Sequence, residues 1–200
     1  MKLPIALVTL LLICSSSAVA PAADLYPSAD RLAFTRLKSL VGHWDGDTAF
    51  GQIRLSYELA SDGNVLLEHE RIDARHENMV TAYYLENGKL ALTHYCEIGN
   101  QSRMTAKRID LSKGEIDFEF AGAGHSASDH ISHMQSVIVR LIDADHFSSD
   151  WTIFQNAKPS LSVRGRYDRV IDSSLRMELT LLKLWWKLQN STGWGSQALR

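Results

Sequence analysis

Residues 79–96, M-V-T-A-Y-Y-L-E-N-G-K-L-A-L-T-H-Y-C, decide the architecture of this protein. Two runs rich in apolar residues flank Asn87-Gly88, a dipeptide that favours a two-residue type I′ turn between antiparallel strands. Such a turn sets the register of the hairpin, which predicts the pairs Leu85–Leu90, Tyr83–Leu92, Thr81–His94 and Met79–Cys96. The charged residues beside the turn belong to the other face, so the face with Tyr83 and His94 is expected to point inward.

The two-residue period continues on both sides of this hairpin. Alternating apolar and polar residues in 53–59, 116–120 and 161–167 indicate strands with one buried and one solvated face. Turn residues separate the runs at 62–64, 99–100, 113–114, 143–145 and 156–159. About ten short strands between Trp44 and Tyr167, with no helix between them, are typical of an antiparallel sandwich or an up-and-down barrel.

A short amphipathic helix is expected before the first strand, at residues 29–41. Gly42 stands where such a helix ends. Its apolar positions are Leu32, Phe34, Leu37, Leu40 and Val41.

Composition excludes several classes of protein. The 200 residues include 21 Lys and Arg against 23 Asp and Glu, a formal net charge of −2, which provides no general attraction to nucleic acid. Hydrophobic residues make up 45% and charged residues 22%, as in a chain that buries a core. We therefore expect one globular domain and no nucleic-acid partner.

Residues 1–22 have the pattern of a secretory signal peptide. Lys2 precedes an apolar run that ends at Ile13, and cleavage is expected after Ala22. A lipoprotein anchored through Cys14 is the weaker alternative, because bulky Ile13 precedes that cysteine. Export to the periplasm or the medium would leave Cys96 as the one cysteine of the mature chain, so no internal disulfide is expected.

The stretch 42–46, G-H-W-D-G, follows the predicted helix and opens the series of strands. In this respect the chain resembles the calycin superfamily of lipocalins, fatty-acid-binding proteins and nitrobindin-like barrels. Residues 79–104 also look like uncharacterised exported bacterial proteins. The resemblance implies an up-and-down barrel at 23–172, followed by a tail at 173–200. It gives structural roles to four residues: Gly42, Trp44, Gly46 and Arg166.

In such barrels an arginine of the last strand covers the tryptophan of the first. Arg164, Arg166 and Arg169 are the candidates for stacking on Trp44. The alternative is that Trp44 is an ordinary core aromatic.

The resemblance also implies a lumen that holds an apolar molecule, or haem in the nitrobindin branch. We expect His94 and Tyr83 to orient a polar head of the ligand. The alternatives are that His94 ligates haem iron, or that it is a core histidine satisfied by Thr81 or Tyr83. The predicted ligand-binding residues are Tyr57, Met79, Tyr83, Leu92, His94, Met104, Phe118, His133 and Trp151.

Other groups of polar residues are weaker candidates for a site. His125, Asp129, His130 and His133 fall in a Gly-, Ala- and Ser-rich segment that reads as a loop, and His94 with Cys96 gives too few ligands for a metal. We therefore predict no metal site. His133 shares the parity of the following strand, which favours a place at the barrel mouth opposite His94.

Catalytic motifs provide little support for an enzyme. The sequence contains no nucleophile elbow and no H-E-x-x-H motif. The carboxylate pairs Glu68/Glu70 and Asp117/Glu119 are interpreted as solvated.

Residues 175–188 predict an amphipathic helix. Arg176, Thr180, Lys183 and Lys187 form one stripe, and the rest of the surface carries leucines and Trp185-Trp186. This helix is expected either to dock on the barrel or to contact a membrane or partner through residues 174–189.

These patterns favour an exported, non-enzymatic β-barrel that binds a small apolar or amphipathic molecule and needs no cofactor. The first alternative is a haem protein that uses His94. The second is a barrel packed solid, acting through its C-terminal helix.

Overall fold

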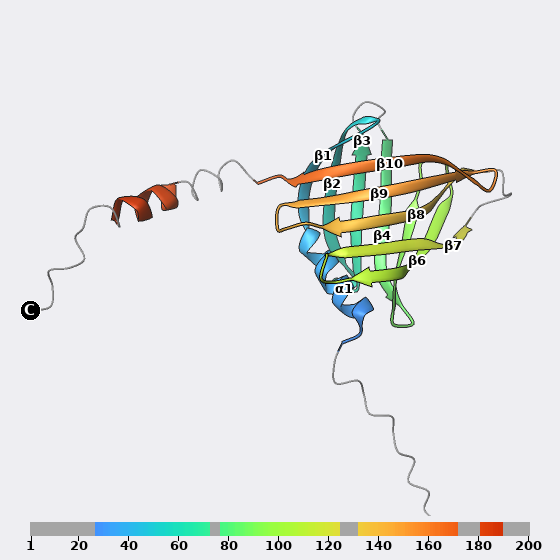
Figure 1. The fold of residues 1–200 in the computed structure, drawn as a ribbon, viewed down its shortest axis with the longest axis horizontal. Helices are drawn as coiled ribbons and strands as arrows, with labels where there is room; N and C mark the ends of the chain where they lie inside the picture. The colour runs from blue at the N-terminus through green and yellow to red at the C-terminus, as the bar shows by residue number, and fades with distance from the viewer. Residues whose placement is uncertain (1–26, 73–76, 125–131, 172–180, 190–200) are drawn as a thin grey trace, which may run out of the picture.

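Ten antiparallel strands close into a barrel in the computed structural model of the chain, which describes residues 27–72, 77–124, 132–171 and 181–189 (Figure 1). Each strand pairs with the next along the chain, and the first pairs with the last. The strands are β1 (Gly42–Thr48), β2 (Gly51–Ala60), β3 (Val65–Ile72), β4 (Glu77–Glu86), β5 (Lys89–Tyr95), β6 (Gln101–Asp110), β7 (Glu115–Gly124), β8 (His133–Leu141), β9 (His146–Gln155) and β10 (Lys158–Arg169). The predicted up-and-down barrel is confirmed.

The β4–β5 hairpin has the predicted turn and register. Asn87 and Gly88 both have positive φ, 50° and 79°, as a type I′ turn requires. Leu85–Leu90, Tyr83–Leu92 and Thr81–His94 are opposite one another, whereas β5 ends at Tyr95, before the predicted Met79–Cys96 pair. Because the turn sets the register locally, the inward direction of Tyr83 and His94 was predictable.

A helix covers one end of the barrel. α1 (Ala29–Leu37) and the 3-10 turn η1 (Lys38–Leu40) precede β1, and α1 contacts β4, β5 and β6. Ser28 caps α1 by accepting the N–H of Arg31 at 3.3 Å. This end of the barrel is called the helix end below. The opposite end contains the turn between β1 and β2 and is called the distal end.

The buried face of this helix differs from the predicted one. Phe34, Leu37 and Leu40 are buried as expected, but Leu32 and Val41 are exposed. Asp30 is buried instead, and its Oδ1 accepts the backbone N–H of Leu90 at 2.9 Å. The Asp30 carboxylate thus satisfies a backbone N–H at the start of β5. This contact places the side of α1 that carries Asp30 against the barrel.

Trp44 lies at the helix end beneath an arginine of β10. Its indole N–H donates to the carbonyl oxygen of Leu40 at 2.7 Å, and the guanidinium of Arg169 lies 4.1 Å from its ring centroid. The prediction that Arg166 stacks on Trp44 is wrong. Arg169 does so, because Arg169 is opposite Trp44 in the β1–β10 register and the two side chains are therefore on the same face of the sheet. Arg166 pairs with Asp47 and is exposed.

Gly42 and Gly46, on either side of Trp44, are each required to be glycine for a different reason. Gly42 has φ of +125°, a conformation that side chains rarely adopt. A Cβ on Gly46 would lie 2.4 Å from Cδ1 of Tyr167, so only glycine allows that ring to pass.

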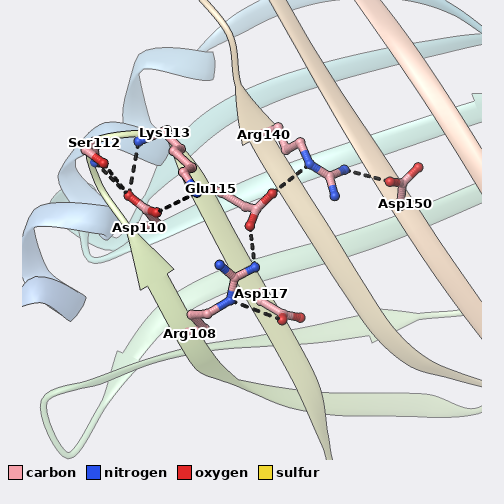
Figure 2. Close-up of polar contacts among 8 residues, drawn as sticks. All are labelled: Arg108, Asp110, Ser112, Lys113, Glu115, Asp117, Arg140 and Asp150. Atoms are coloured by element: carbon pink, nitrogen blue, oxygen red, sulfur yellow. Dashed lines mark hydrogen bonds and ion pairs between the residues drawn. The ribbon is translucent and has the colours of Figure 1, made fainter.

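Ion pairs connect β6 to β9 on the outer surface (Figure 2). Glu115 accepts hydrogen bonds from Arg108 and from Arg140, the latter at 2.8 Å. Arg140 also donates to Asp150 at 2.6 Å, and Arg108 lies 3.9 Å from Asp117. Asp110 accepts the hydroxyl of Ser112 and the N–H of Lys113 in the β6–β7 turn, so Figure 2 also shows how this turn is held.

The carboxylates of Asp117 and Glu119 are outside the barrel, as predicted, and Glu119 accepts a bond from Lys107 at 2.9 Å.

Residues 181–189 form a helix, and all nine residues are exposed. Its exposed apolar residues are Leu181, Leu182, Leu184, Trp185, Trp186 and Leu188. Among the described residues, no helix has the length and apolar character needed to cross a membrane. The predicted signal peptide at 1–22, the residues His125, Asp129 and His130, and the rest of the tail before 181 and after 189 lie outside the described residues.

Candidate functional site: a cavity beside His94

A cavity of about 290 Å³ opens inside the barrel toward the distal end. Residues next to the distal turns, including Thr48, Glu97 and Ser132, contribute to its lining. Its apolar surface comes mainly from Ile53, Ile72, Met79, Trp151, Ile153 and Val163. The polar or ionisable residues that reach it from the strands and the β5–β6 turn include Glu70, His94, Cys96, Glu97, His133 and Tyr167. A mostly apolar cavity with a few polar groups is the usual form of a small-molecule site.

His94 is the most buried polar residue of this lining, with 1% of its surface exposed. Its Nδ1 lies 2.9 Å from the hydroxyl of Thr81, while its Nε2 has no hydrogen-bond partner within the part of the chain that the structure describes. The ring also packs against Trp151, with 5.1 Å between centroids. Thr81 thus satisfies one nitrogen, as the core-histidine alternative predicted, and the second nitrogen has no partner among the described residues.

Burial lowers the pKa of His94 to about 4. The imidazole is therefore neutral at pH 7, and it offers either one N–H donor or one bare nitrogen at Nε2.

Glu68 lies inside the barrel, 4% exposed, and Thr81 separates it from His94 in the strand pairing. Its Oε2 accepts the hydroxyl of Tyr57 at 2.6 Å and that of Tyr83 at 2.9 Å. Burial raises the pKa of Glu68 above its ordinary value, although the hydrogen bonds from Tyr57 and Tyr83 oppose that rise. The interpretation of Glu68 as a solvated carboxylate is therefore wrong.

The sequence V-L-L-E-H-E-R-I of β3 explains this error. Apolar residues occur at both parities, so the strand has no clear alternation that would show which face is buried. The pairing across strands shows it: Tyr57 is opposite Glu68, Glu68 opposite Thr81, and Thr81 opposite His94. Cross-strand partners share a face, so four neighbouring strands bring one polar row into the interior.

The predicted lumen residues divide into two groups. Met79, His94, His133 and Trp151 line the cavity. The other five are buried in the packed core and do not line it: Tyr57, Tyr83, Leu92, Met104 and Phe118. The helix-end half of the barrel is filled by side chains such as Phe147, which stacks on Tyr167 at 4.4 Å and meets Trp44 edge-on at 4.8 Å.

His133 is half-buried at the cavity, where its Nε2 lies 3.0 Å from the Gln135 amide oxygen. Cys96 is half-buried as well, and burial raises the pKa of its thiol. The described residues contain no cluster of three or more His, Cys, Asp or Glu side chains arranged to hold a metal ion.

Haem fits this site in one respect only. A neutral imidazole with a bare Nε2 is a normal axial ligand of haem iron. The volume of about 290 Å³ is at the lower limit of ligand pockets, which span about 300–1,000 Å³, so an enclosed porphyrin does not fit it.

The fold and the cavity together define a closed antiparallel β-barrel with a small internal site. The sequence matches no protein-family model and no curated protein. Among solved structures, the chain is similar to a protein of unknown function of the DUF3598 family from Nostoc punctiforme PCC 73102, with 12% identity and a TM-score of 0.46. The match covers 67% of this chain and 48% of that one, so this chain spans about half the length of that relative.

Proposed function

We propose that this protein is a non-enzymatic, calycin-like barrel that binds a small amphipathic molecule in the cavity beside His94. The observation that carries the proposal is the buried Nε2 of His94, which has no hydrogen-bond partner among the residues that the structure describes, on a cavity whose remaining lining is mostly apolar. A buried polar atom in a native protein almost always has a partner, and a ligand head group is one source of that partner. Ordered water is the other source, and the experiment below separates the two.

Binding follows from partition between water and the cavity. The apolar part of the ligand leaves water for a surface of isoleucine, methionine and tryptophan, which stabilises the complex by about 25 cal/mol per Å² of apolar area buried. The small cavity sets an upper limit on the size of the ligand, and the polar atoms of His94 and its neighbours orient the head group. No step of bond making or breaking is part of this proposal.

Export is part of the same proposal. The expected signal peptide at 1–22 supports a periplasmic or secreted protein, whose mature N-terminus would be residue 23. N-terminal sequencing of the protein from its native host tests this directly.

Native mass spectrometry of protein purified from its native compartment tests the binding. We expect a discrete additional mass that disappears on denaturation. In a second step, Val163→Trp fills the cavity and should remove that mass, whereas Ser162→Trp, at an exposed neighbouring position of β10, should retain it. A bare protein mass in the parent protein argues for water in the cavity and against tight ligand binding.

The haem alternative has its own test, because a neutral imidazole whose Nε2 carries no proton can ligate haem iron. Addition of haemin to the purified protein should produce a Soret band that is lost in His94→Ala if that alternative is right. We expect no such band, because the cavity is too small to enclose a porphyrin.

A further inference from the structure

The helix at 181–189 exposes its apolar side chains, in contrast to the helix that precedes the barrel. Phe34 and Leu37 of α1 have only 4% and 0% of their surface exposed, because α1 packs on the strands. The leucine and tryptophan side chains of the helix at 181–189 are between 52% and 65% exposed: Leu181, Leu182, Leu184, Trp185, Trp186 and Leu188. A continuous apolar surface of this kind marks a site of contact with another surface.

The charged residues of this helix are confined to one side. At about 100° per residue, its leucines and tryptophans extend over roughly 200° of the circumference, with Trp185 near the middle of the arc. Lys183 and Lys187 are one turn apart on the opposite side, and Gln189, the last residue of the helix, is the one polar side chain within the arc. Residues 181–189 contain neither aspartate nor glutamate, so both side-chain charges of the helix are positive.

This composition fits the interface of an anionic membrane. The indole of tryptophan combines an apolar ring with an N–H donor and is enriched at the level of the lipid headgroups, and anionic headgroups attract nearby lysines. An apolar stripe of about 100° is enough for a helix that docks on a globular protein, whereas the wider arc of 181–189 can sink into the boundary between headgroups and acyl chains. At 1.5 Å per residue the nine residues are about 14 Å long, less than half of the hydrocarbon thickness of about 30 Å, so the helix would lie along the surface.

We infer that the helix at 181–189 binds the surface of an anionic phospholipid membrane, with Trp185 toward the acyl chains and Lys183 and Lys187 at the headgroup phosphates. The contact would hold the barrel at the membrane surface. The helix contributes no residue to the described lining of the cavity beside His94, so this membrane contact goes beyond the proposed ligand binding and does not depend on it.

Vesicle flotation tests the contact with protein purified from its native compartment. The two probes are vesicles of phosphatidylcholine alone and vesicles of phosphatidylcholine with an equal amount of phosphatidylglycerol. We expect partition onto the anionic vesicles to be about tenfold stronger or more, because two lysines face the headgroups. Equal partition onto the two compositions, or no binding to either, overturns the inference and leaves the proposed function standing.

A pair of glutamate substitutions separates the apolar arc from the overall charge of the protein. Leu184→Glu places a carboxylate in the arc and should weaken partition onto the anionic vesicles by about tenfold or more, because that charge would have to leave water. Ile142→Glu is the matched control, since Ile142 is an apolar residue of the β8–β9 turn with 64% of its surface exposed. It should retain the partition of the parent protein. An equal loss in the two variants would assign the binding to net charge and overturn the inference.

Fluorescence quenching reports whether the apolar arc enters the membrane. Anionic vesicles that contain phospholipids brominated on their acyl chains should quench the tryptophan emission of the bound protein, and Trp185→Phe should reduce this quenching. Trp44 and Trp151 are buried in the barrel and should not contribute. Bound protein that is not quenched, or quenching that is unchanged in Trp185→Phe, overturns the inference, because the arc would then lie outside the acyl chains.

A second copy of this chain is the alternative occupant of the arc. In that case the protein would self-associate without vesicles, and Leu184→Glu would restore the monomer in sedimentation velocity. Self-association of this kind, without binding to the anionic vesicles, overturns the inference.

Discussion

The guanidinium carbon of Arg169 lies 4.1 Å from the centre of the Trp44 indole ring, and the same guanidinium donates to three backbone carbonyls. These are the carbonyls of Ala144 at 2.8 Å, Val41 at 3.0 Å and Ser39 at 2.8 Å. One side chain therefore joins β10 to the turn after β8 and to the segment between the helix and β1. Because β1 and β10 are the two strands whose pairing closes the barrel, this contact stabilises the closure.

Replacement of Arg169 by alanine should lower the free energy of unfolding by about 2–4 kcal/mol, because it removes a cation–π contact and three charge-assisted hydrogen bonds. Urea denaturation measures the change. The matched control is Arg166→Ala, whose exposed side chain should contribute less than about 0.5 kcal/mol. Equal effects of the two substitutions would show that the stacking does not stabilise the barrel.

Gly46→Ala should lower the free energy of unfolding by about 1–3 kcal/mol, since its Cβ would lie 2.4 Å from the Tyr167 ring and 2.6 Å from the carbonyl oxygen of Arg166. A thermal melt followed by circular dichroism detects this loss. Asp45→Ala, at an exposed position of the same strand, serves as the control. An unchanged melting temperature for Gly46→Ala would mean that Tyr167 moves aside freely.

The buried histidine should make the fold sensitive to mild acid. The pKa of His94 is about 4 in the folded protein and 6.5 when exposed, so the unfolded state takes up the proton first as the pH falls. The stability that neutral His94 contributes is therefore complete above about pH 6.5 and is lost as the pH falls toward 4. Integrated over this window, the loss is about 3 kcal/mol.

A comparison with His94→Asn isolates this effect. Asparagine keeps a polar group beside Thr81 but does not titrate, and every other acid group, including Glu68, is common to both proteins. Unfolding free energies measured at pH 7 and pH 4 should fall more steeply in the parent protein than in His94→Asn. Parallel pH profiles would contradict a buried, neutral His94.

The outer ion pairs should respond to acid for a different reason. Burial raises the pKa values of Glu115 and Asp150, but the arginine partners outweigh burial and hold both below their ordinary values. Their stabilisation is present above the ordinary carboxyl pKa and is lost as the pH falls through the lowered values.

Arg140 bonds both carboxylates, so Arg140→Met should lower the free energy of unfolding by about 1–2 kcal/mol at pH 7 and by less at pH 3. Urea denaturation at the two pH values is the measurement. Lys107→Met breaks an exposed pair with Glu119 and should change stability by less than about 0.5 kcal/mol. A cost for Arg140→Met that does not depend on pH would assign its effect to packing.

The exposed helix at 181–189 is expected to bind membranes. Its leucines and tryptophans, together with Lys183 and Lys187, have the composition of a helix that lies in a membrane interface. The full chain should sediment with anionic phospholipid vesicles, and deletion of 173–200 should abolish this while leaving the melting temperature of the barrel unchanged. Vesicle binding that survives the deletion would place the contact on another part of the chain.

The sequence alone determined the features that depend on neighbours in the chain. The Asn87-Gly88 turn set the register of β4 and β5, so the facing of Thr81 and His94 followed from a local rule. The spacing of turn residues likewise predicted about ten strands, and the apolar pattern of residues 29–41 predicted a helix before them. Such features are local because turn chemistry and the two-residue period of a strand act over only a few residues.

Only the tertiary structure decided the features that depend on strands far apart in the chain. Trp44 and Arg169 meet because the first and last strands pair, and no local pattern distinguished Arg169 from Arg166. Glu68 faces the interior because its neighbours across the strands, Tyr57 and Thr81, share that face, and the hydroxyls of Tyr57 and Tyr83 hydrogen-bond its Oε2 there. A carboxylate in an ambiguous strand is normally solvated. The sequence also could not predict which inward-facing residues pack in the core and which line the cavity. That division depends on how side chains from all ten strands fill the same interior.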